Sequence, residues 1–287
     1  MNTIMIIAKT HEPRCVKLTE ELIVWLDGRG IRACVEDHMY KELTNVYIPV
    51  ERFGTTRGNT AELVVVLGGD GTLIAATRII GDRDVPILGV NLGSLGFLTE
   101  ITLDEMYFTL EHVLRGNYEV TNRMMLGVHV KRGGEIIENH RVLNDAVINK
   151  GALARIIGMS TSVNNRFLTH FKADGLIVST PTGSTGYSLS ANGPIIQPDL
   201  ECICITPICP HTLTNRPIVV SSISNIEINM NEIDDSVYLT LDGQVGVKLQ
   251  GGDIVQIRKA NNSTRLIKSR TKDYFEVIRT KLKWGER

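Results

Sequence analysis

A glycine-rich turn around one carboxylate stands directly after a continuous apolar run. The run covers residues 63–67, the turn is Gly68-Gly69-Asp70-Gly71-Thr72, and a short helical pattern follows over residues 73–80. In open α/β sheets, ligands bind at the carboxyl ends of strands, where glycine amides and a helix amino terminus can approach phosphate oxygens. Because a carboxylate repels phosphate, Asp70 indicates a base for a hydroxyl or a metal ligand, unless it only caps the helix.

A second polar segment follows the strand-like residues 174–178. Residues 179–193 are dense in glycine, serine and threonine and contain one aromatic residue, Tyr187. They offer many hydroxyl and amide donors but no lysine for a Walker-type phosphate grip, so the segment suits a sugar or a nucleotide. The alternative is a solvated cluster of turns, for which the segment is unusually long.

The overall charge excludes partners that need a global electrostatic field. The chain has 287 residues, with 31 Lys and Arg against 32 Asp and Glu, and a formal net charge of −1. This balance would attract neither a nucleic acid nor an anionic membrane, so any anion site must be local. No apolar run approaches the roughly 18 residues of a membrane span.

The cysteines and the amino terminus indicate the compartment. Five cysteines, an odd number without repeated spacing, favour a reducing environment over a disulfide framework. The apolar run at residues 4–8 is too short for the core of a signal peptide and is followed by Lys9. We therefore expect a cytoplasmic protein.

Strand-like and helix-like periods alternate through the first part of the chain, which is typical of a Rossmann-like α/β domain with a parallel sheet. We expect this domain at residues 1–115. Thr102 and Glu105 form a capping box at the start of its last helix. The predicted strands and helices cover residues 4–8, 13–28, 63–67, 73–80, 85–90 and 102–114.

Turn signals then recur about every dozen residues, as in a β-sandwich-like domain. We expect this domain at residues 116–265, with two-residue hairpin turns at Gly133-Gly134 and Asn164-Asn165. A carboxy-terminal segment, residues 266–287, is expected to pack back on the first domain. Two domains agree with a length of about 150 residues per domain.

The two polar segments, with Leu143-Asn144-Asp145 between them and residues 210–217 after them, resemble the bacterial NAD kinases. These enzymes transfer the γ-phosphate of ATP to the 2′-hydroxyl of the adenosine ribose of NAD and so make NADP. The resemblance spans residues 60–250, and four motifs in fixed order are more specific than one. The glycine-rich turn alone also occurs in phosphofructokinases and in diacylglycerol and sphingosine kinases.

The resemblance implies a role for each matching position. Asp70 would be the catalytic base that accepts the proton of the 2′-hydroxyl. Asn144 and Asp145 would hydrogen-bond ribose and amide groups of NAD, and Tyr187 would lie against a ring. The phosphate-donor loop would comprise Gly68, Gly69, Gly71 and Thr72. The NAD site would comprise Asp70, Gly71, Asn144, Asp145, Arg155, Lys172, Asp174, Thr185, Gly186, Tyr187, Ser188, Leu189, Ser190 and Gln244.

The resemblance also implies the cofactor and the partners. Mg²⁺ or another divalent cation would arrive on the phosphates of ATP, because no cluster in the sequence offers a metal cage and no protein metal ligand is expected. NAD and ATP would be the substrates, bound in a cleft between the two domains. We expect a homo-oligomer, a dimer or a tetramer, with neither a nucleic acid nor a membrane as partner.

Three positions differ from the residues that are usual in the family. Gly186 stands where alanine is usual, Asn192 where glycine is usual, and Lys172 where arginine or histidine is frequent, which affects fine substrate preference.

Two other functions stay open. One alternative is a lipid kinase of the diacylglycerol kinase type, which shares the glycine-rich turn. The other is a nucleotide-binding regulator that has lost catalysis.

Overall fold

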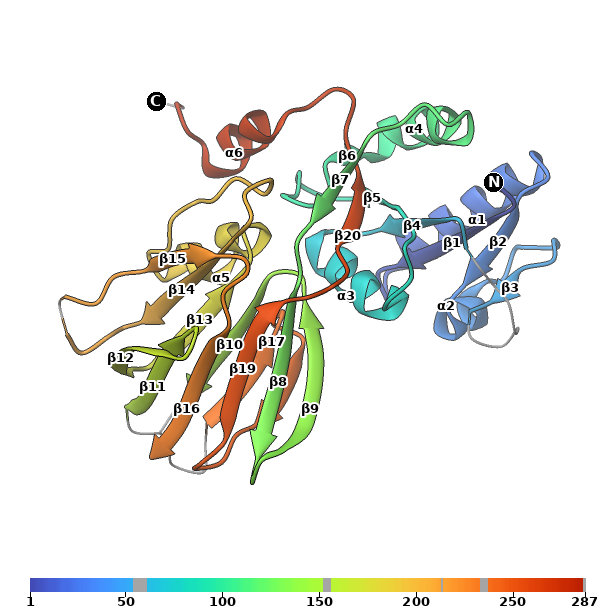
Figure 1. The fold of residues 1–287 in the computed structure, drawn as a ribbon. Coiled ribbons are helices and arrows are strands. Elements are labelled where there is room, and N and C mark those ends of the chain that lie inside the picture. Colours follow the sequence, from blue (N-terminus) through green and yellow to red (C-terminus); the bar gives the residue numbers. More distant parts are fainter. Residues whose placement is uncertain (54–60, 152–155, 213, 233–236, 286–287) are drawn as a thin grey trace. The chain divides into compact units, whose positions relative to one another are not determined.

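The computed structural model describes residues 1–53, 61–151, 156–212, 214–232 and 237–285 (Figure 1). The chain divides into two compact units. The first contains Met1–Asn122 and Thr264–Arg287, and the second contains Arg123–Ser263. None of the helices within the described ranges is long and apolar enough to cross a membrane.

The first unit is built on an eight-stranded sheet in the order β3-β2-β1-β4-β5-β20-β7, with β6 paired to β5. Its strands are β1 (Thr3–Ala8), β2 (Arg32–Val35), β3 (Glu51–Arg52), β4 (Leu63–Leu67), β5 (Ile87–Asn91), β6 (Ile101–Thr102), β7 (Val120–Arg123) and β20 (Thr264–Ile267). The pairs that join β3, β2, β1, β4 and β5 are all parallel. Every residue of β4 is buried, as expected for a strand covered on both faces.

The order of the strands reverses direction between β1 and β4. From β1 the chain moves outward to β2 and β3, whereas from β4 it moves the other way to β5. This is the topological switch point at which open α/β sheets bind ligands, outside the carboxyl ends of the strands. The predicted Rossmann-like fold class is confirmed.

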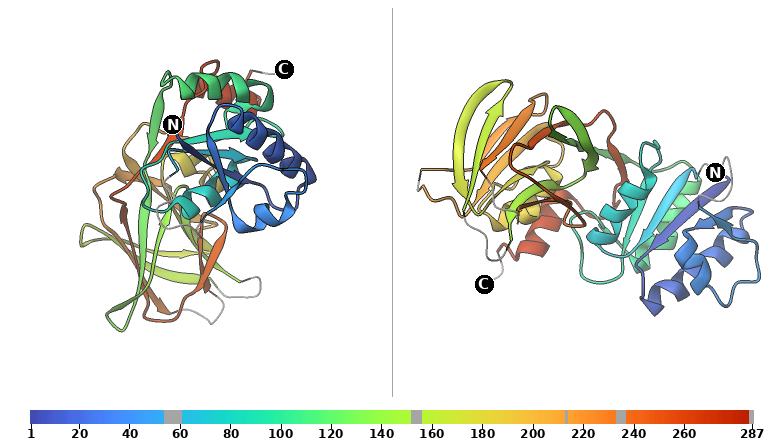
Figure 2. Two further views of the ribbon diagram at one scale, coloured as in Figure 1. Left: turned by 90° about the vertical axis from the view of Figure 1, so that its right-hand side faces the viewer. Right: turned by 90° about the horizontal axis from the view of Figure 1, so that it is seen from below.

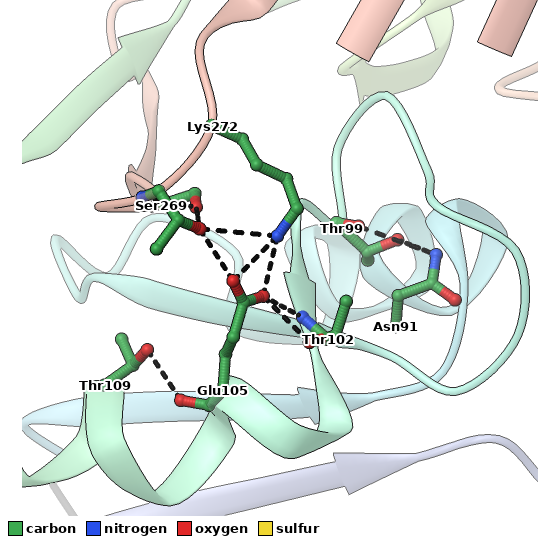
Figure 3. Close-up of polar contacts among 8 residues, drawn as sticks. Asn91, Thr99, Thr102, Glu105, Thr109, Ser269 and Lys272 are labelled. Carbon is green, nitrogen blue, oxygen red and sulfur yellow. Dashed lines mark hydrogen bonds and ion pairs between the residues drawn. The ribbon is translucent and has the colours of Figure 1, made fainter. Parts of the chain in front are cut away.

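The helices of the first unit are α1 (Pro13–Asp27), α2 (Asp37–Glu42), α3 (Asp70–Ile80), α4 (Leu103–Leu114) and α6 (Tyr274–Leu282). α3 begins at Asp70, three residues before the predicted start. The capping box at α4 is confirmed, because Glu105 Oε2 accepts both the amide and the hydroxyl of Thr102 at 2.8 Å. Lys272, from the carboxy-terminal segment, donates to the same carboxylate at 2.7 Å (Figure 3).

The second unit consists of two six-stranded sheets, in the orders β15-β14-β13-β10-β17-β18 and β12-β11-β16-β19-β8-β9. One core joins them, to which inward-facing residues of both sheets contribute. Figures 1 and 2 show the strands of the two sheets lying in two layers. The strands are β8 (Leu126–Arg132), β9 (Glu135–Val142), β10 (Asp145–Lys150), β11 (Ile157–Val163), β12 (Arg166–Ala173), β13 (Gly175–Ser179), β14 (Cys202–Ile208), β15 (Ile218–Ser221), β16 (Ile226–Glu232), β17 (Val237–Leu241), β18 (Val245–Lys248) and β19 (Ile254–Lys259).

Both predicted hairpin turns are present in this unit. Gly133 and Gly134 join β8 to β9, and Asn164 and Asn165 join β11 to β12 with φ angles of 51° and 61°. After β13 the chain forms a 3₁₀ turn, η1 (Thr182–Thr185), and a single helical turn, α5 (Tyr187–Ser190). The second predicted domain is thus the expected antiparallel sandwich.

Candidate functional site

A pocket of about 340 Å³ lies at the switch point of the first unit. The segments that follow β1, β4 and β5 line it, with Lys9 and Arg14 from the first, Gly68 and Gly69 from the second and Ser94 from the third. Gly68 has to be a glycine, because a Cβ atom there would lie 2.4 Å from Thr72 Oγ1. Gly69 has open space where a Cβ atom would lie, so a ligand in the pocket can approach its backbone closely. Gly71 and Thr72 belong to the first turn of α3 and are not among the lining residues.

The two basic side chains of this pocket were not predicted as site residues. Arg14 Nη1 donates to the carbonyl of Leu92 at 3.0 Å, which holds the guanidinium across the pocket. Lys9 Nζ lies 3.8 Å from Glu12 Oε2, and its side chain is 61% exposed. Their position directly after the first strand was the available signal, since the carboxyl end of β1 forms one side of the switch point.

Asp70 does not cap its helix, so that alternative reading is wrong. The cap position of α3 is Gly69, and the Asp70 carboxylate is turned toward the segment after β5. Oδ2 accepts the amide of Phe97 at 2.8 Å, and Oδ1 accepts the amide of Leu98 at 3.1 Å and the amide and hydroxyl of Thr99 at 3.0 and 2.9 Å. The carboxylate thereby fixes a loop that lies 27 to 29 residues further along the chain.

A second pocket, of about 350 Å³, lies in the second unit. Its lining includes Asn144, Asp145, Tyr187, Asp242 and Gly243, which come from three separate parts of the chain. β10 supplies one wall, because Asp145, Val147 and Asn149 share one face of the strand and the alternate residues face the core. The structure therefore brings together Asn144, Asp145 and Tyr187 among the predicted NAD-binding residues.

Asp242 orders the Asn144-Asp145 segment. Its Oδ2 accepts the amide of Leu143 at 2.9 Å, and its Oδ1 accepts the amides of Asn144 and Asp145 at 2.7 and 3.1 Å. Burial, and then the negative charge of Asp242, raises the pKa of Asp145 to about 7. Asp145 is thus a carboxyl group that can change its protonation state near neutral pH.

The loop after β13 meets the same segment. Thr180 Oγ1 donates to the carbonyl of Leu143 at 2.6 Å, which fastens the start of the loop. Tyr187 is 48% exposed and lines the pocket. A Cβ atom on Gly186 would lie 3.9 Å from Asp145 Oδ2, so this glycine is also beside the buried carboxyl.

Other predicted residues of this loop are placed differently. Ser188 is fully buried, and its hydroxyl lies 3.0 Å from Thr206 Oγ1, so it faces the interior. Thr185 donates its hydroxyl to the carbonyl of Thr182 at 3.3 Å. Leu189 and Ser190 of this loop, and Gln244 after β17, are not among the residues that line the pocket.

Two predicted residues lie near the opposite end of β10. Asp145 pairs with Ser179, whereas Asn149, four residues on and about 13 Å along the strand, pairs with Gly175 beside Asp174. Asp174 Oδ1 forms an ion pair with Lys150 at 2.8 Å, and the Lys172 side chain is exposed. Arg155, also predicted to bind NAD, lies outside the described residues.

Comparison with known proteins assigns the chain to a family. Residues 4–118 match the model of the ATP-NAD kinase N-terminal domain, and residues 143–269 match that of the ATP-NAD kinase C-terminal domain. The chain belongs to the ATP-NAD kinase family. It is 67% identical to the NAD kinase of Geobacter sp. (strain M21) over 288 residues and 65% identical to that of Citrifermentans bemidjiense, with full coverage of both chains in each case.

Solved structures agree with this assignment. The chain resembles yeast NADH kinase complexed with NADH, with a TM-score of 0.92 and 26% identity over 100% of this chain and 89% of that chain. It also resembles an NAD kinase from Archaeoglobus fulgidus in complex with ATP, with a TM-score of 0.73 and 25% identity over 98% and 99% of the chains. As a member of this family the chain is an ATP-dependent NAD kinase, and neither the lipid kinase nor the silent regulator is supported.

Proposed function

We propose that Asp70 is the general base and that the phosphoryl acceptor is the 2′-hydroxyl of the adenosine ribose of NAD. The carboxylate takes the hydroxyl proton while the ribose oxygen forms a bond to the γ-phosphorus of ATP. The bond from that phosphorus to the β,γ-bridging oxygen breaks, and its electron pair leaves with ADP. The observation that carries this proposal is a carboxylate at the first residue of α3, next to Gly69 of the switch-point pocket.

The switch-point pocket is the proposed site of the donor phosphates. Gly68 and Gly69 offer closely approachable backbone, and the amino terminus of α3 adds a favourable dipole. Lys9 and Arg14 supply the positive charge that the glycine-rich turn lacks, and Gly71 and Thr72 remain part of the proposed loop through the first turn of α3. These two cations offset the negative charge that develops during transfer.

The pocket of the second unit is the proposed site of the dinucleotide. Asn144 Oδ1 is buried and accepts no hydrogen bond from the described residues, so a ligand donor would remove the cost of leaving it unsatisfied. With a pKa of about 7, Asp145 can donate to or accept from ribose hydroxyls. Tyr187 offers an exposed ring for stacking. Because the Ser188 hydroxyl is engaged with Thr206, we propose that this residue contributes only its backbone.

The remaining predicted residues stay part of the proposed NAD site. Lys150 joins the proposed site through its ion pair with Asp174 at 2.8 Å, and Lys172 is an exposed second cation of the site. The other members are Arg155, Thr185, Gly186, Leu189, Ser190 and Gln244.

Mg²⁺ is the proposed cofactor, carried by ATP. The described residues contain no group of three or more His, Cys, Asp or Glu side chains arranged for a metal ion. Mg²⁺ keeps most of its waters and is usually held by substrate phosphates with one or two carboxylates, so the proposal requires no dedicated cage of protein ligands. When bound, the cation neutralises charge on the transferring phosphoryl group.

Replacement of Asp70 by Asn tests the proposal. We expect Asp70→Asn to bind NAD normally in calorimetry while NADP formation from ATP, Mg²⁺ and NAD falls by about 10²- to 10⁴-fold. Phosphorus NMR of the wild-type product identifies the 2′-phosphate. Asp84→Asn is the matched control, since Asp84 lies on the surface of the same unit and pairs only with Arg265 among the described residues. Ordinary turnover in Asp70→Asn would refute the assigned base.

We also propose a homo-oligomer in the cytoplasm. Phe167, Ile218 and Val219 are exposed apolar residues on edge strands of the second unit, and a second copy would cover them. All five cysteines lie outside disulfides, which fits a reducing compartment. Light scattering after gel filtration measures the assembly, and cell fractionation measures the compartment.

A further inference from the structure

The hydrogen bonds of Asp70 are divided unevenly between its two carboxylate oxygens. Oδ1 accepts three donors, the amides of Leu98 and Thr99 and the Thr99 hydroxyl, at 3.1, 3.0 and 2.9 Å. Within the described ranges, Oδ2 accepts only the amide of Phe97, at 2.8 Å. A carboxylate oxygen offers about two lone-pair directions, so Oδ1 is fully engaged and Oδ2 keeps capacity for one more proton donor.

The direction of the Thr99 hydroxyl is fixed by Asn91. Asn91 Nδ2 donates to Thr99 Oγ1 at 3.0 Å (Figure 3), and because an amide nitrogen cannot accept, the hydroxyl proton is left for Asp70. The Asn91 amide is oriented at both ends, since its Oδ1 accepts the amide of Gly93 and its Nδ2 donates to the carbonyl of Ser94, each at 2.7 Å. Asn91 is 5% exposed and Thr99 is 0% exposed, so water does not compete for these bonds.

Gly96 closes over the hydrogen bond between Thr99 and Asp70. A Cβ atom at this position would lie 2.1 Å from Asp70 Oδ1 and 2.3 Å from Thr99 Oγ1. Any other residue at position 96 would have to displace one of the two side chains. Glycine at position 96 therefore lets the loop lie directly against the Asp70 carboxylate and the Thr99 hydroxyl.

From these contacts we infer that Thr99, and Asn91 acting through it, are positioning residues for phosphoryl transfer. They hold Oδ1 of Asp70 and leave Oδ2 as the oxygen that takes the proton of the substrate hydroxyl. This inference rests on the proposed function of Asp70 as the base. A carboxylate can act as a base without buried hydrogen-bond partners. The positioning role explains why Asn91 and Thr99 are linked to Asp70 by buried hydrogen bonds.

Kinetics of three threonine variants test the role of Thr99. Thr99→Val removes the hydroxyl and Thr99→Ser keeps it. Thr109→Val is a matched control because, among the residues that the structure describes, the hydroxyl of Thr109 donates only to the carbonyl of Glu105 in its own helix, at 2.8 Å. We expect Thr99→Val to lower kcat about tenfold with the KM for NAD and for ATP unchanged, and Thr99→Ser to restore most of that loss. Thr109→Val should keep the wild-type kcat.

Other outcomes would overturn the inference. Equal losses in the two valine variants, a loss in Thr99→Ser as large as in Thr99→Val, or a rise in KM without a fall in kcat would assign Thr99 to folding or binding alone. Thr99→Ala provides the same comparison if thermal unfolding shows that Thr99→Val does not fold.

A double-mutant cycle tests whether Asn91 acts through Thr99. We expect Asn91→Ala to cost less kcat in the Thr99→Val background than in the wild-type chain, since the relay is already broken there. Fully additive losses would contradict the relay. Asp70→Asn separates the two proposals, because normal turnover in that variant refutes the base, whereas an inactive Asp70→Asn beside a normal Thr99→Val refutes only the positioning role.

Discussion

The carboxylate of Asp242 accepts the backbone amide of Asn144 at 2.7 Å, across 98 residues of sequence. Asp242 also accepts the amides on either side, so one side chain holds three consecutive peptide units. Asp70 does the same in the first unit, with the amides of residues 97–99. Each unit therefore uses a carboxylate that follows a strand to hold three consecutive amides of another segment.

Replacement of Asp242 by Asn should weaken NAD binding more than catalysis. The amide has one acceptor oxygen in place of two, so at least one of the three backbone amides loses its partner. We expect the KM for NAD to rise about tenfold, with a loss of stability of about 1–3 kcal/mol. Steady-state kinetics and urea unfolding measure the two effects. Asp199→Asn is the control, since Asp199 is in the same unit and bonds only the side chain of Gln197 among the described residues.

The stability of the unliganded protein should fall as pH rises from about 4 to about 7. Burial and the charge of Asp242 raise the pKa of Asp145 from 3.8 to about 7, so in this interval the folded state binds a proton that the unfolded state has lost. The stability that this bound proton adds is complete below the pKa of Asp145 in the unfolded state, 3.8. It is lost once the pH exceeds the pKa of Asp145 in the folded state, about 7. Asp145→Asn should remove this component, which amounts to at most about 4 kcal/mol. Identical slopes of unfolding free energy against pH in the two proteins would contradict the assignment.

Removal of either cation of the switch-point pocket should weaken ATP binding. Lys9→Gln and Arg14→Gln each delete one positive charge from the proposed phosphate site, and we expect the KM for ATP to rise about tenfold while the KM for NAD stays constant. The effect should shrink at high ionic strength, because Lys9 is exposed. Lys17→Gln is the control on the same segment, where Lys17 pairs with Glu21 on the surface. An unchanged KM for ATP in both variants would remove these residues from the site.

Replacement of Lys272 should lower the thermal stability of the first unit at neutral pH. It should also make that stability fall less when the pH is lowered. Burial opposes ionisation of Glu105, but hydrogen bonds from Lys272, Thr271 and Thr102 more than offset it and lower its pKa to about 2. The stabilisation is present above the unfolded value of 4.5 and is lost as pH falls toward 2. Lys272→Met should therefore cost about 1 kcal/mol at pH 7 and almost nothing near pH 2. Thermal unfolding at the two pH values measures the difference, with Lys268→Met as the exposed control.

Periodicity predicted the elements whose burial pattern is regular. The β-branched run at residues 63–67 became β4 without a shift of either boundary, because a strand covered on both faces leaves no ambiguity. The predicted strand at 85–90 instead runs from Ile87 to Asn91, since Pro86 has no amide to donate to the ladder. α2 and β3 were not predicted, since six and two residues are too short for a period to emerge.

The proposed site was predictable only where its residues are close together in sequence. The Gly-Asp-Gly turn predicts a role for Asp70, but the hydrogen-bond partners of this residue come from residues 97–99, and no local pattern indicates a bond over that separation. The ion pair of Asp174 with Lys150 likewise depends on strand register. Lys9 and Arg14 were not predicted because charged residues often follow a strand. Only the order of the strands in the sheet shows which strand ends lie side by side.

The position of β20 determines when the first unit can be completed during synthesis. Its four residues stand between β5 and β7, yet they are translated after the whole of the second unit. The sandwich, a continuous stretch of chain, can fold on the ribosome while β5 still waits for its neighbour. A chain interrupted before residue 264 would therefore expose the part of the β5 edge that β6 leaves unpaired. Such an edge is the kind of surface on which chains aggregate, so the last two dozen residues protect the first hundred.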